Sequence, residues 1–286
     1  MRFVSFNVQY GVGLDGVCDP KRIADAVRGA DIIALQEVSR NLPKNSHADL
    51  PAIFASLLPD YFTAFGSGVD ADMGSEIIDG KAVSRRLNFG NMVLSRYPIL
   101  TVRNILLPRT RTFGLLNLQR SAVEALIGAP SGPIRVYSVH LDHTGPAERI
   151  MQIDYLKQRA SLYGVEGGGI SGHSDLGFPD APHTDDYLLM GDFNMLPESS
   201  EYIAMAGPKD PYYGRTPRAT CPTDALDYLG KRGAGAYTWE EPSRSDIRQY
   251  LDHCFVSGSL VGRLKDGWVD EACVASDHKP VWLEIG

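Results

Sequence analysis

Two charged side chains stand together close to the C-terminus, where their chemistry needs a partner. Asp277 and His278 lie in the motif Ser276–Pro280, directly before the apolar run Val281–Ile285. Placing a carboxylate and an imidazole at the start of a buried strand is costly unless both groups bind something. The pair therefore suggests a site in which the aspartate and the histidine each have a partner from elsewhere in the chain.

A second polar motif ends the apolar run Tyr187–Phe193. Asp192 and Asn194 are two residues apart, so both fall on one face of an extended strand. A carboxylate beside a carboxamide is suited to holding a water molecule or a cation. Asp and Asn are also common in turns where strands stop, and four residues alone do not distinguish these readings.

Other apolar segments end in polar residues in the same way. His140 closes Ile134–Leu141, Glu37 follows five mostly apolar residues, Asn7 ends a short apolar segment, and Asp252 lies inside an apolar strand. Singly, each has an ordinary explanation, such as a buried core histidine or a glutamate that faces water. Together they predict that several strand ends converge, because buried charges without partners are too costly to accumulate by chance. The oxygen-rich set without a thiolate cluster favours Mg²⁺ or Mn²⁺.

Short strands and a few helices must position these residues. Strand-like segments bracket a helix that Asp19 can cap and Pro20 can begin. Further strands are predicted at Asn91–Ser95, Ala122–Ile127, Ile134–Leu141, Tyr187–Phe193, Leu251–Ser257 and Val281–Ile285, and helices at Leu50–Leu58, 146–164 and Ser200–Ala206. Strands spread along the whole chain favour sheet packed on sheet with helices outside.

The chain shows no internal repeat and no linker-like segment, so we expect a single domain spanning 1–286. Residues 164–187 are rich in Gly, Asp, Pro and His and are predicted to form an insertion loop. This loop is either a lid beside a site or a solvated surface loop. His173 and His183 within it are candidate metal ligands.

The charge and composition of the chain make some classes of function less favoured than others. The net charge of −7 and the pI of about 5.5 lack the basic footprint of proteins that bind nucleic acid through its phosphates. A divalent cation can still bridge an acidic protein to an anionic substrate. No apolar run is long enough for a membrane-spanning helix. Four scattered cysteines without paired spacing favour a reduced, cytoplasmic protein.

The motifs together resemble a known group. Those that carry the resemblance are "SFNVQYG", "LQEV", "GNMVLSRYPI", "SVHLDH", "GDFN", "YLDHCFVS" and "SDHKPV". They occur in the order seen in the endonuclease/exonuclease/phosphatase superfamily, which includes pancreatic deoxyribonuclease, apurinic endonucleases, neutral sphingomyelinases and inositol polyphosphate 5-phosphatases. The resemblance extends from Arg2 to about Ile285. It implies an α/β four-layer sandwich of two packed mixed β-sheets flanked by α-helices, with metal-dependent cleavage of a phosphate ester at one end.

The resemblance implies roles for individual residues. Glu37 matches the principal metal ligand, and Asn7 and Asp277 match residues that help to coordinate the cation directly or through water. Asp192 matches the aspartate that activates the attacking water, and Asn194 the residue that contacts the phosphate.

Four further roles follow from the same resemblance. His278 matches the histidine that hydrogen-bonds a phosphate oxygen or relays a proton, with Asp252 as its partner. His140 matches a candidate general acid found in the deoxyribonuclease and sphingomyelinase branches. Arg120 stands where those branches place a phosphate-contacting arginine, although it also reads as an ordinary surface arginine.

The resemblance does not choose a substrate, because one scaffold serves nucleic acids, lipids and soluble phosphates. The acidic composition favours a small or soluble phosphate mono- or diester, cleaved by in-line attack of an activated water. A nuclease is the alternative, and the basic clusters Ser84–Arg86 and Arg103–Arg111 are where a phosphate-rich ligand would bind. A catalytically inactive binding protein is less favoured, because every matched position holds a usable residue. Neither stable membrane association nor an obligate protein partner is expected.

Overall fold

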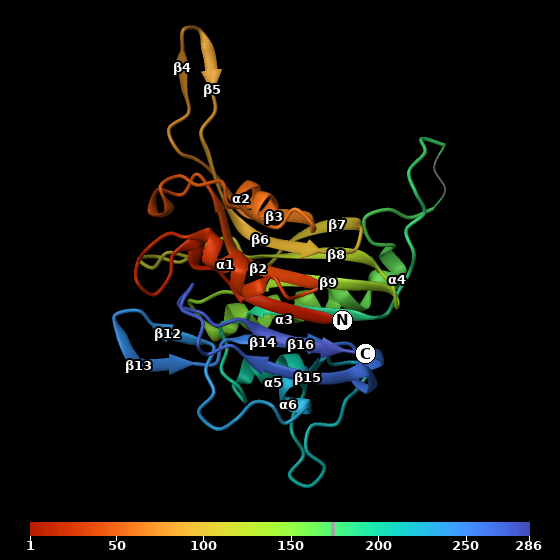
Figure 1. Ribbon diagram of the computed structural model, residues 1–286. Helices are drawn as coiled ribbons and strands as arrows, with labels where there is room; N and C mark the ends of the chain where they lie inside the picture. The colour runs from red at the N-terminus through yellow and green to blue at the C-terminus, as the bar shows by residue number, and fades with distance from the viewer. Residues whose placement is uncertain (173–174) are drawn as a thin grey trace.

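The computed structural model describes residues 1–172 and 175–286, and most of its strands belong to two six-stranded mixed sheets (Figure 1). The first sheet has the order β15 (Leu264–Val269), β16 (Val281–Ile285), β1 (Arg2–Asn7), β2 (Ile32–Arg40), β6 (Arg86–Ser95), β3 (Phe62–Asp72). The second has the order β11 (Thr223–Asp224), β14 (Asp252–Val256), β10 (Tyr187–Asp192), β9 (Gly132–His140), β8 (Ser121–Ala129), β7 (Ile99–Leu106). Two small hairpins pair β12 (Trp239–Glu241) with β13 (Arg244–Gln249), and β4 (Glu76–Ile78) with β5 (Lys81–Val83).

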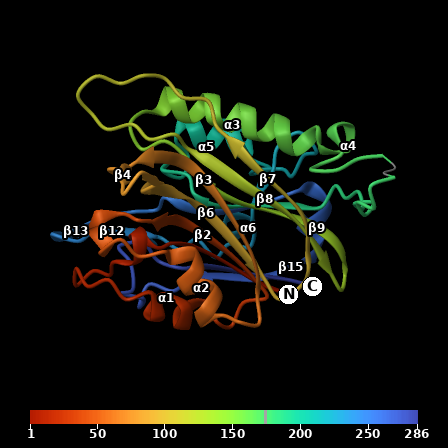
Figure 2. The ribbon, with the colours of Figure 1, turned by 90° about the horizontal axis from the view of Figure 1, so that it is seen from above.

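Helices cover the outer face of each sheet (Figure 2). On the first sheet lie α1 (Pro20–Val27) and α2 (Leu50–Leu57), and on the second lie α3 (Pro146–Ser161) and α5 (Ser200–Ala206). The shorter helical elements are α4 (Tyr163–Glu166), α6 (Ala225–Tyr228), η1 (Gln9–Gly11), η2 (Pro43–Asn45) and η3 (Gly258–Arg263). Within the described part of the chain, no helix combines the length and the apolar character needed to cross a membrane.

Strand alternation produces three apolar layers. Phe3 and Met190 point into the core between the sheets, whereas Val4 packs against the first pair of helices and Leu189 against the second. Because successive side chains of a strand point to opposite faces, each strand contributes to two layers. The predicted four-layer α/β sandwich of two mixed sheets is therefore confirmed.

Most predicted elements form at the expected places. Each of the six strand predictions coincides with an observed strand, and β6 extends five residues further toward its N-terminal end than expected. Asp19 caps α1 by accepting a hydrogen bond from the Lys21 backbone amide, and Pro20 begins the helix. Strand β3 was missed, because the Gly and Asp residues in its sequence weaken the apolar alternation that marks a strand.

The sequence left open whether residues 164–187 form a lid or a surface loop, and the structure favours the surface loop. This segment leads into β10, which begins at Tyr187 and ends at Asp192. It therefore joins β10 at the end of the strand opposite to Asp192, about 17 Å away along the strand. Residues 164–166 belong to α4, and the His183 ring packs against Tyr163 at a centroid distance of 6.3 Å, so His183 is not a ligand at this site. His173 lies outside the described residues.

Candidate active site

The sequence-predicted residues gather at one end of the sandwich because they extend the rows of side chains that face the inter-sheet core. On β10, Leu188 and Met190 belong to that core and Asp192 is the next residue on the same face. By the same alternation β1 delivers Asn7, β9 delivers His140 and β14 delivers Asp252. Each row of apolar side chains therefore ends in a polar residue, at the end of the sandwich where these strand ends meet.

Strands β9 and β10 are parallel, and their register sets His140 directly beside Asp192. Gly191 makes this close pairing feasible, because a Cβ at that position would lie 1.9 Å from the carbonyl oxygen of Val139. His140 Nε2 lies 3.3 Å from Asp192 Oδ2. The glycine of the "GDFN" motif thus fixes the position of the aspartate that follows it.

Asp192 accepts hydrogen bonds at both of its carboxylate oxygens. Its Oδ2 accepts a hydrogen bond of 2.9 Å from Asn7 Nδ2, and its Oδ1 accepts one of 2.9 Å from the Asn194 backbone amide. Burial alone would raise the pKa of Asp192, but the neighbouring His278 and His140 and these hydrogen bonds hold it well below its usual range. Asp192 is therefore ionised at neutral pH.

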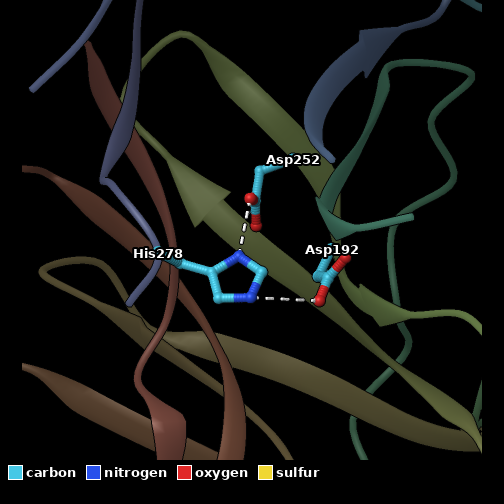
Figure 3. A group of neighbouring side chains, drawn as sticks. All are labelled: Asp192, Asp252 and His278. Atoms are coloured by element: carbon cyan, nitrogen blue, oxygen red, sulfur yellow. Dashed lines mark hydrogen bonds and ion pairs between the residues drawn. The ribbon is translucent and has the colours of Figure 1, made fainter. Parts of the chain in front are cut away.

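His278 and Asp252 form a buried pair (Figure 3). His278 Nδ1 lies 2.8 Å from Asp252 Oδ2, while Nε2 on the other side of the ring lies 3.7 Å from Asp192 Oδ2. Burial opposes the charged imidazole, yet the carboxylates of Asp252 and Asp192 raise the pKa of His278 to about 10. His278 is therefore an imidazolium ion at neutral pH, held by Asp252 and directed at Asp192.

Asp192, Asp252 and His278 offer ligand atoms within 4.8 Å of one another, a spacing that could hold a metal ion. The hydrogen bond to Asp252 already occupies His278 Nδ1, and a protonated imidazole has no free lone pair for a metal. These three side chains are therefore better suited to transferring a proton and stabilising charge than to binding a metal ion.

The segment that carries Asp277 and His278 is clamped to the β12 region. The Lys279 amide donates to the Thr238 carbonyl oxygen at 2.7 Å, and the Glu240 amide donates to the Asp277 carbonyl oxygen at 3.0 Å. Lys279 is only 1% exposed, and its Nζ donates to Glu240 Oε1 at 2.6 Å. Lysine is rarely buried without a partner, so this ion pair is a structural anchor for the site.

Replacing Lys279 by methionine should lower the free energy of unfolding by about 2 kcal/mol, because it removes the buried partner of the Glu240 carboxylate and leaves only the more exposed Arg248, 3.4 Å away. Urea unfolding of both proteins measures this difference. The double variant Lys279→Met/Glu240→Gln also removes the buried carboxylate charge and should regain a large part of the loss. A single variant as stable as the wild-type protein would show that the pair does not anchor the segment.

Glu37 reaches the site through a β-bulge. Leu35 and Val38 of β2 both face the outer helices, and the pairing with β6 shifts register between them. Glu37 adopts φ 59°, in the left-handed region that non-glycine residues rarely occupy. Regular alternation from Leu35 would point Glu37 at the outer helices, so the bulge redirects its side chain into the site.

Glu37 and Asp277 are two acidic groups at one wall of the site. Burial and the nearby Asp277 carboxylate raise the pKa of Glu37 to about 7. No described residue donates a hydrogen bond to the Glu37 carboxylate, whereas Asp277 Oδ2 accepts one of 3.1 Å from Trp239 Nε1. Two repelling carboxylates, one of them without a donor, form an oxygen-rich wall that fits a hard divalent cation.

A cationic cluster lines the same cavity. Arg120 is 6% exposed, its Nη2 lies 2.8 Å from His143 Nδ1, and its Nη1 lies 2.9 Å and 3.1 Å from Nε2 and Nδ1 of His140. Burial and Arg120 lower the pKa of His140 to about 4 and also lower the pKa of His143. Both imidazoles are therefore neutral at pH 7, and Arg120 carries the charge of the cluster. Arg120 is a buried part of the site and not a surface arginine.

The site opens into a cavity of about 740 Å³. Of the residues predicted from the sequence, those that line it are Glu37, Arg120, His140, Asp192, Asn194, Asp277 and His278. Asn7 and Asp252 lie behind this lining, fully or almost fully buried, and hold Asp192 and His278 from the protein side. All nine predicted residues therefore come together at one end of the molecule.

Sequence reasoning missed His143 and Trp239, which also line the cavity. For His143 a signal was present, because it follows His140 by three residues in "HLDH" and the chain turns there at the end of β9. Trp239 gave none, because its contact with Asp277 joins positions 38 residues apart in the sequence.

Comparison with known proteins identifies the family and the fold of the chain. The model of the Endonuclease/Exonuclease/phosphatase family matches residues 4–278. Among solved structures, an endonuclease/exonuclease/phosphatase from Beutenbergia cavernae is 22% identical, with a TM-score of 0.68 over 100% of this chain and 72% of the other. A mannosyl-6-phosphatase from Bacteroides thetaiotaomicron is 18% identical, with a TM-score of 0.61 over 100% and 99%. Truncated TDP2 from Caenorhabditis elegans is 17% identical, with a TM-score of 0.60 over 99% and 95%. The curated proteins contain no match to the chain.

Proposed function

Because the chain belongs to the endonuclease/exonuclease/phosphatase family and is therefore a metal-dependent phosphoester hydrolase, we propose that its cavity cleaves a small phosphodiester by in-line attack of water. The observation that carries this proposal is the pairing of an ionised Asp192 with a protonated His278 at the floor of the cavity. A base and a cationic donor held side by side suit attack of water on a phosphorus atom and stabilisation of the negative charge on its phosphoryl oxygens.

Asp192 orients the attacking water and accepts its proton. Asn7 and the Asn194 amide leave the carboxylate little freedom to rotate, because each holds one of its two oxygens. A fixed acceptor lowers the cost of aligning water with the phosphorus atom. Asn194, whose side chain lines the cavity, contacts a phosphoryl oxygen in this proposal.

His278 and Arg120 supply positive charge to the phosphoryl oxygens. His278 Nε2 donates to one of these oxygens, while Asp252 fixes the ring through Nδ1. We assign the charged-donor role to His278 and not to His140, because the lowered pKa of His140 leaves that ring neutral. His140 then acts as a hydrogen-bonding group beside the leaving oxygen.

Glu37 and Asp277 are the carboxylates that would hold the divalent cation, and the Oδ1 of Asn7 would complete the set directly or through water. The oxygen-rich donor set favours Mg²⁺ or Mn²⁺ over softer metals. When bound, such a cation neutralises negative charge on the phosphate ester and its leaving oxygen.

The charge distribution favours a small ester over a nucleic acid. Part of the positive charge of the basic clusters is neutralised, since Arg85 pairs with Glu76, Arg86 with Asp70, and Arg103 with Glu124 and Glu166. Among the described residues, Arg109 and Arg111 have no carboxylate partner. Neither cluster lines the cavity. A nuclease needs cations along the flanking phosphates, so a nuclease is the second candidate.

Hydrolysis of a substrate panel tests this proposal. With Mn²⁺ present, we expect cleavage of bis-p-nitrophenyl phosphate to exceed cleavage of p-nitrophenyl phosphate, without nicking of plasmid DNA. Asp192→Asn is the inactive control in every assay. Rapid plasmid nicking that this variant abolishes would make the protein a nuclease and would contradict the small-ester assignment.

We also propose that residues 1–286 act as one catalytic unit and that the protein is cytoplasmic. Support for the first comes from strands of both sheets that span the chain from β1 to β16. Support for the second comes from the four cysteines, which are all free.

A further inference from the structure

The cavity has an apolar wall that the catalytic chemistry does not use. On β6, Leu87 and Phe89 share the face that further along the strand contributes Val93 to the inter-sheet core. Val69 of β3 pairs directly with Phe89 and lies on the same face. All three line the cavity.

These side chains lie beyond the end of the core. Leu87, Phe89 and Val69 are half-buried, whereas Val93 on the same row is completely buried between the sheets. Apolar side chains at the end of such a row would ordinarily be covered by the opposite sheet. Here they face the cavity, so their apolar surface is free to contact a ligand.

Further apolar residues continue the wall around the cavity. Leu116 and Leu118 come from the loop before β8, Leu42 and Pro43 from the start of η2, and Leu251 from the start of β14. Leu116 is 68% exposed. Because several separate segments contribute to the wall, the cavity has a continuous apolar surface and not a single exposed apolar side chain.

The cavity has few groups for additional phosphates. Among the described residues that line it, Lys44 and Arg120 are the only lysine and arginine, and Glu37, Asp192 and Asp277 are acidic. Lys44 lies over the ring of Tyr10 at 5.6 Å from the centroid. His278 adds one positive charge, so the cationic and acidic groups are equal in number and a polyanion would find no excess of cations, whereas a single phosphate with an apolar group would meet a complementary surface.

We infer that the substrate is a phosphodiester in which one substituent is apolar, an alkyl or aryl group that rests on the wall of Val69, Leu87, Phe89, Leu116 and Leu118. The inference rests on the proposed function, since the phosphate must reach Asp192 and His278. Hydrolysis adds water across the bond from phosphorus to the leaving oxygen and releases an alcohol or phenol and a phosphate monoester.

The test compares hexyl p-nitrophenyl phosphate with methyl p-nitrophenyl phosphate, which share a leaving group and differ in apolar area. We expect kcat/KM for the hexyl ester to be at least about tenfold higher, the effect of burying about two methylene groups. The p-nitrophenyl ester of thymidine 5′-phosphate serves as a comparison, because it carries a polar nucleoside of similar length in place of the hexyl group. Equal values for the hexyl and methyl esters, or a preference for the thymidine ester, would overturn the inference.

Two neighbouring leucines give a matched pair of variants. Leu116→Ser removes part of the wall and should lower the hexyl-to-methyl ratio, as should Leu87→Ser. Leu115 is similarly exposed, at 59%, and does not line the cavity, so Leu115→Ser should keep the wild-type ratio. A ratio that Leu115→Ser and Leu116→Ser change equally would contradict a role for the wall.

Failure of the proposed function has a different signature. If none of the esters is hydrolysed, or if hydrolysis persists in Asp192→Asn, the catalytic assignment fails. If the methyl ester is hydrolysed through Asp192 but the hexyl ester is not preferred, only the apolar inference fails. The last experiment uses phosphatidylcholine vesicles. Cleavage of the vesicle lipid would identify a lipid as the source of the apolar group. Cleavage of the soluble hexyl ester without cleavage of the vesicles would identify a small molecule as the source.

Discussion

Replacing Asp192 by asparagine should lower kcat on bis-p-nitrophenyl phosphate by about 10³-fold while the protein remains folded. Asparagine has nearly the same shape but neither accepts a proton as a base nor carries the charge that faces His278 and His140. A loss of this size corresponds to about 4 kcal/mol of transition-state stabilisation. Steady-state kinetics measures the loss, and circular dichroism confirms the fold.

The matched control for this variant is Asp186→Asn. Asp186 precedes β10, at the opposite end of the strand from Asp192, and lies 3.3 Å from Arg263. We expect it to keep wild-type turnover. If Asp192→Asn and Asp186→Asn have similar kcat values, the carboxylate of Asp192 is not the base.

Replacing Asp252 by asparagine should lower kcat by about 10²-fold and move the alkaline limb of the pH–rate profile to lower pH. The Asp252 and Asp192 carboxylates raise the pKa of His278 to about 10, so the imidazolium persists up to that pH and is lost above it. Removing one of the carboxylates lowers this pKa. The protonated form, which donates to the phosphate, is then lost at a lower pH.

The pH profile separates this positioning role from simple loss of structure. A destabilised protein loses activity at all pH values, whereas a change in the pKa of His278 displaces the limb. Asp246→Asn, on the exposed strand β13, serves as the control and should retain both kcat and the wild-type profile. An Asp252→Asn profile with an unmoved alkaline limb would show that Asp252 does not act through His278.

The layers of the fold were predictable because their signals are local. Asp192, His140, Asn7 and Asp252 each end or begin an apolar row with a period of two, and that period alone assigns their face of the sheet. The convergence of these strand ends followed from the cost of burying unpaired charge.

The direction of the Glu37 side chain could not be predicted from the local sequence pattern. Alternation from Leu35 would direct its side chain toward the outer helices, and the bulge that reverses this depends on pairing with β6, some fifty residues further along the chain. The Lys279–Glu240 anchor is non-local for the same reason.

The position of the loop at residues 164–187 could not be predicted for a related reason. Its composition predicts an insertion loop, but composition carries no information about which end of a strand a loop joins. Only the direction of β10, from Tyr187 to Asp192, decides that it lies away from the site.

The measurement that tests the central claim most directly is the initial rate of bis-p-nitrophenyl phosphate hydrolysis by the wild-type protein and by Asp192→Asn, each with Mg²⁺, with Mn²⁺ and after chelation with EDTA. We predict metal-dependent hydrolysis by the wild-type protein, loss of that rate in EDTA, recovery when the cation is restored, and only background hydrolysis by the variant throughout. A wild-type rate that EDTA leaves unchanged, or a variant as active as the wild-type protein, would contradict the account.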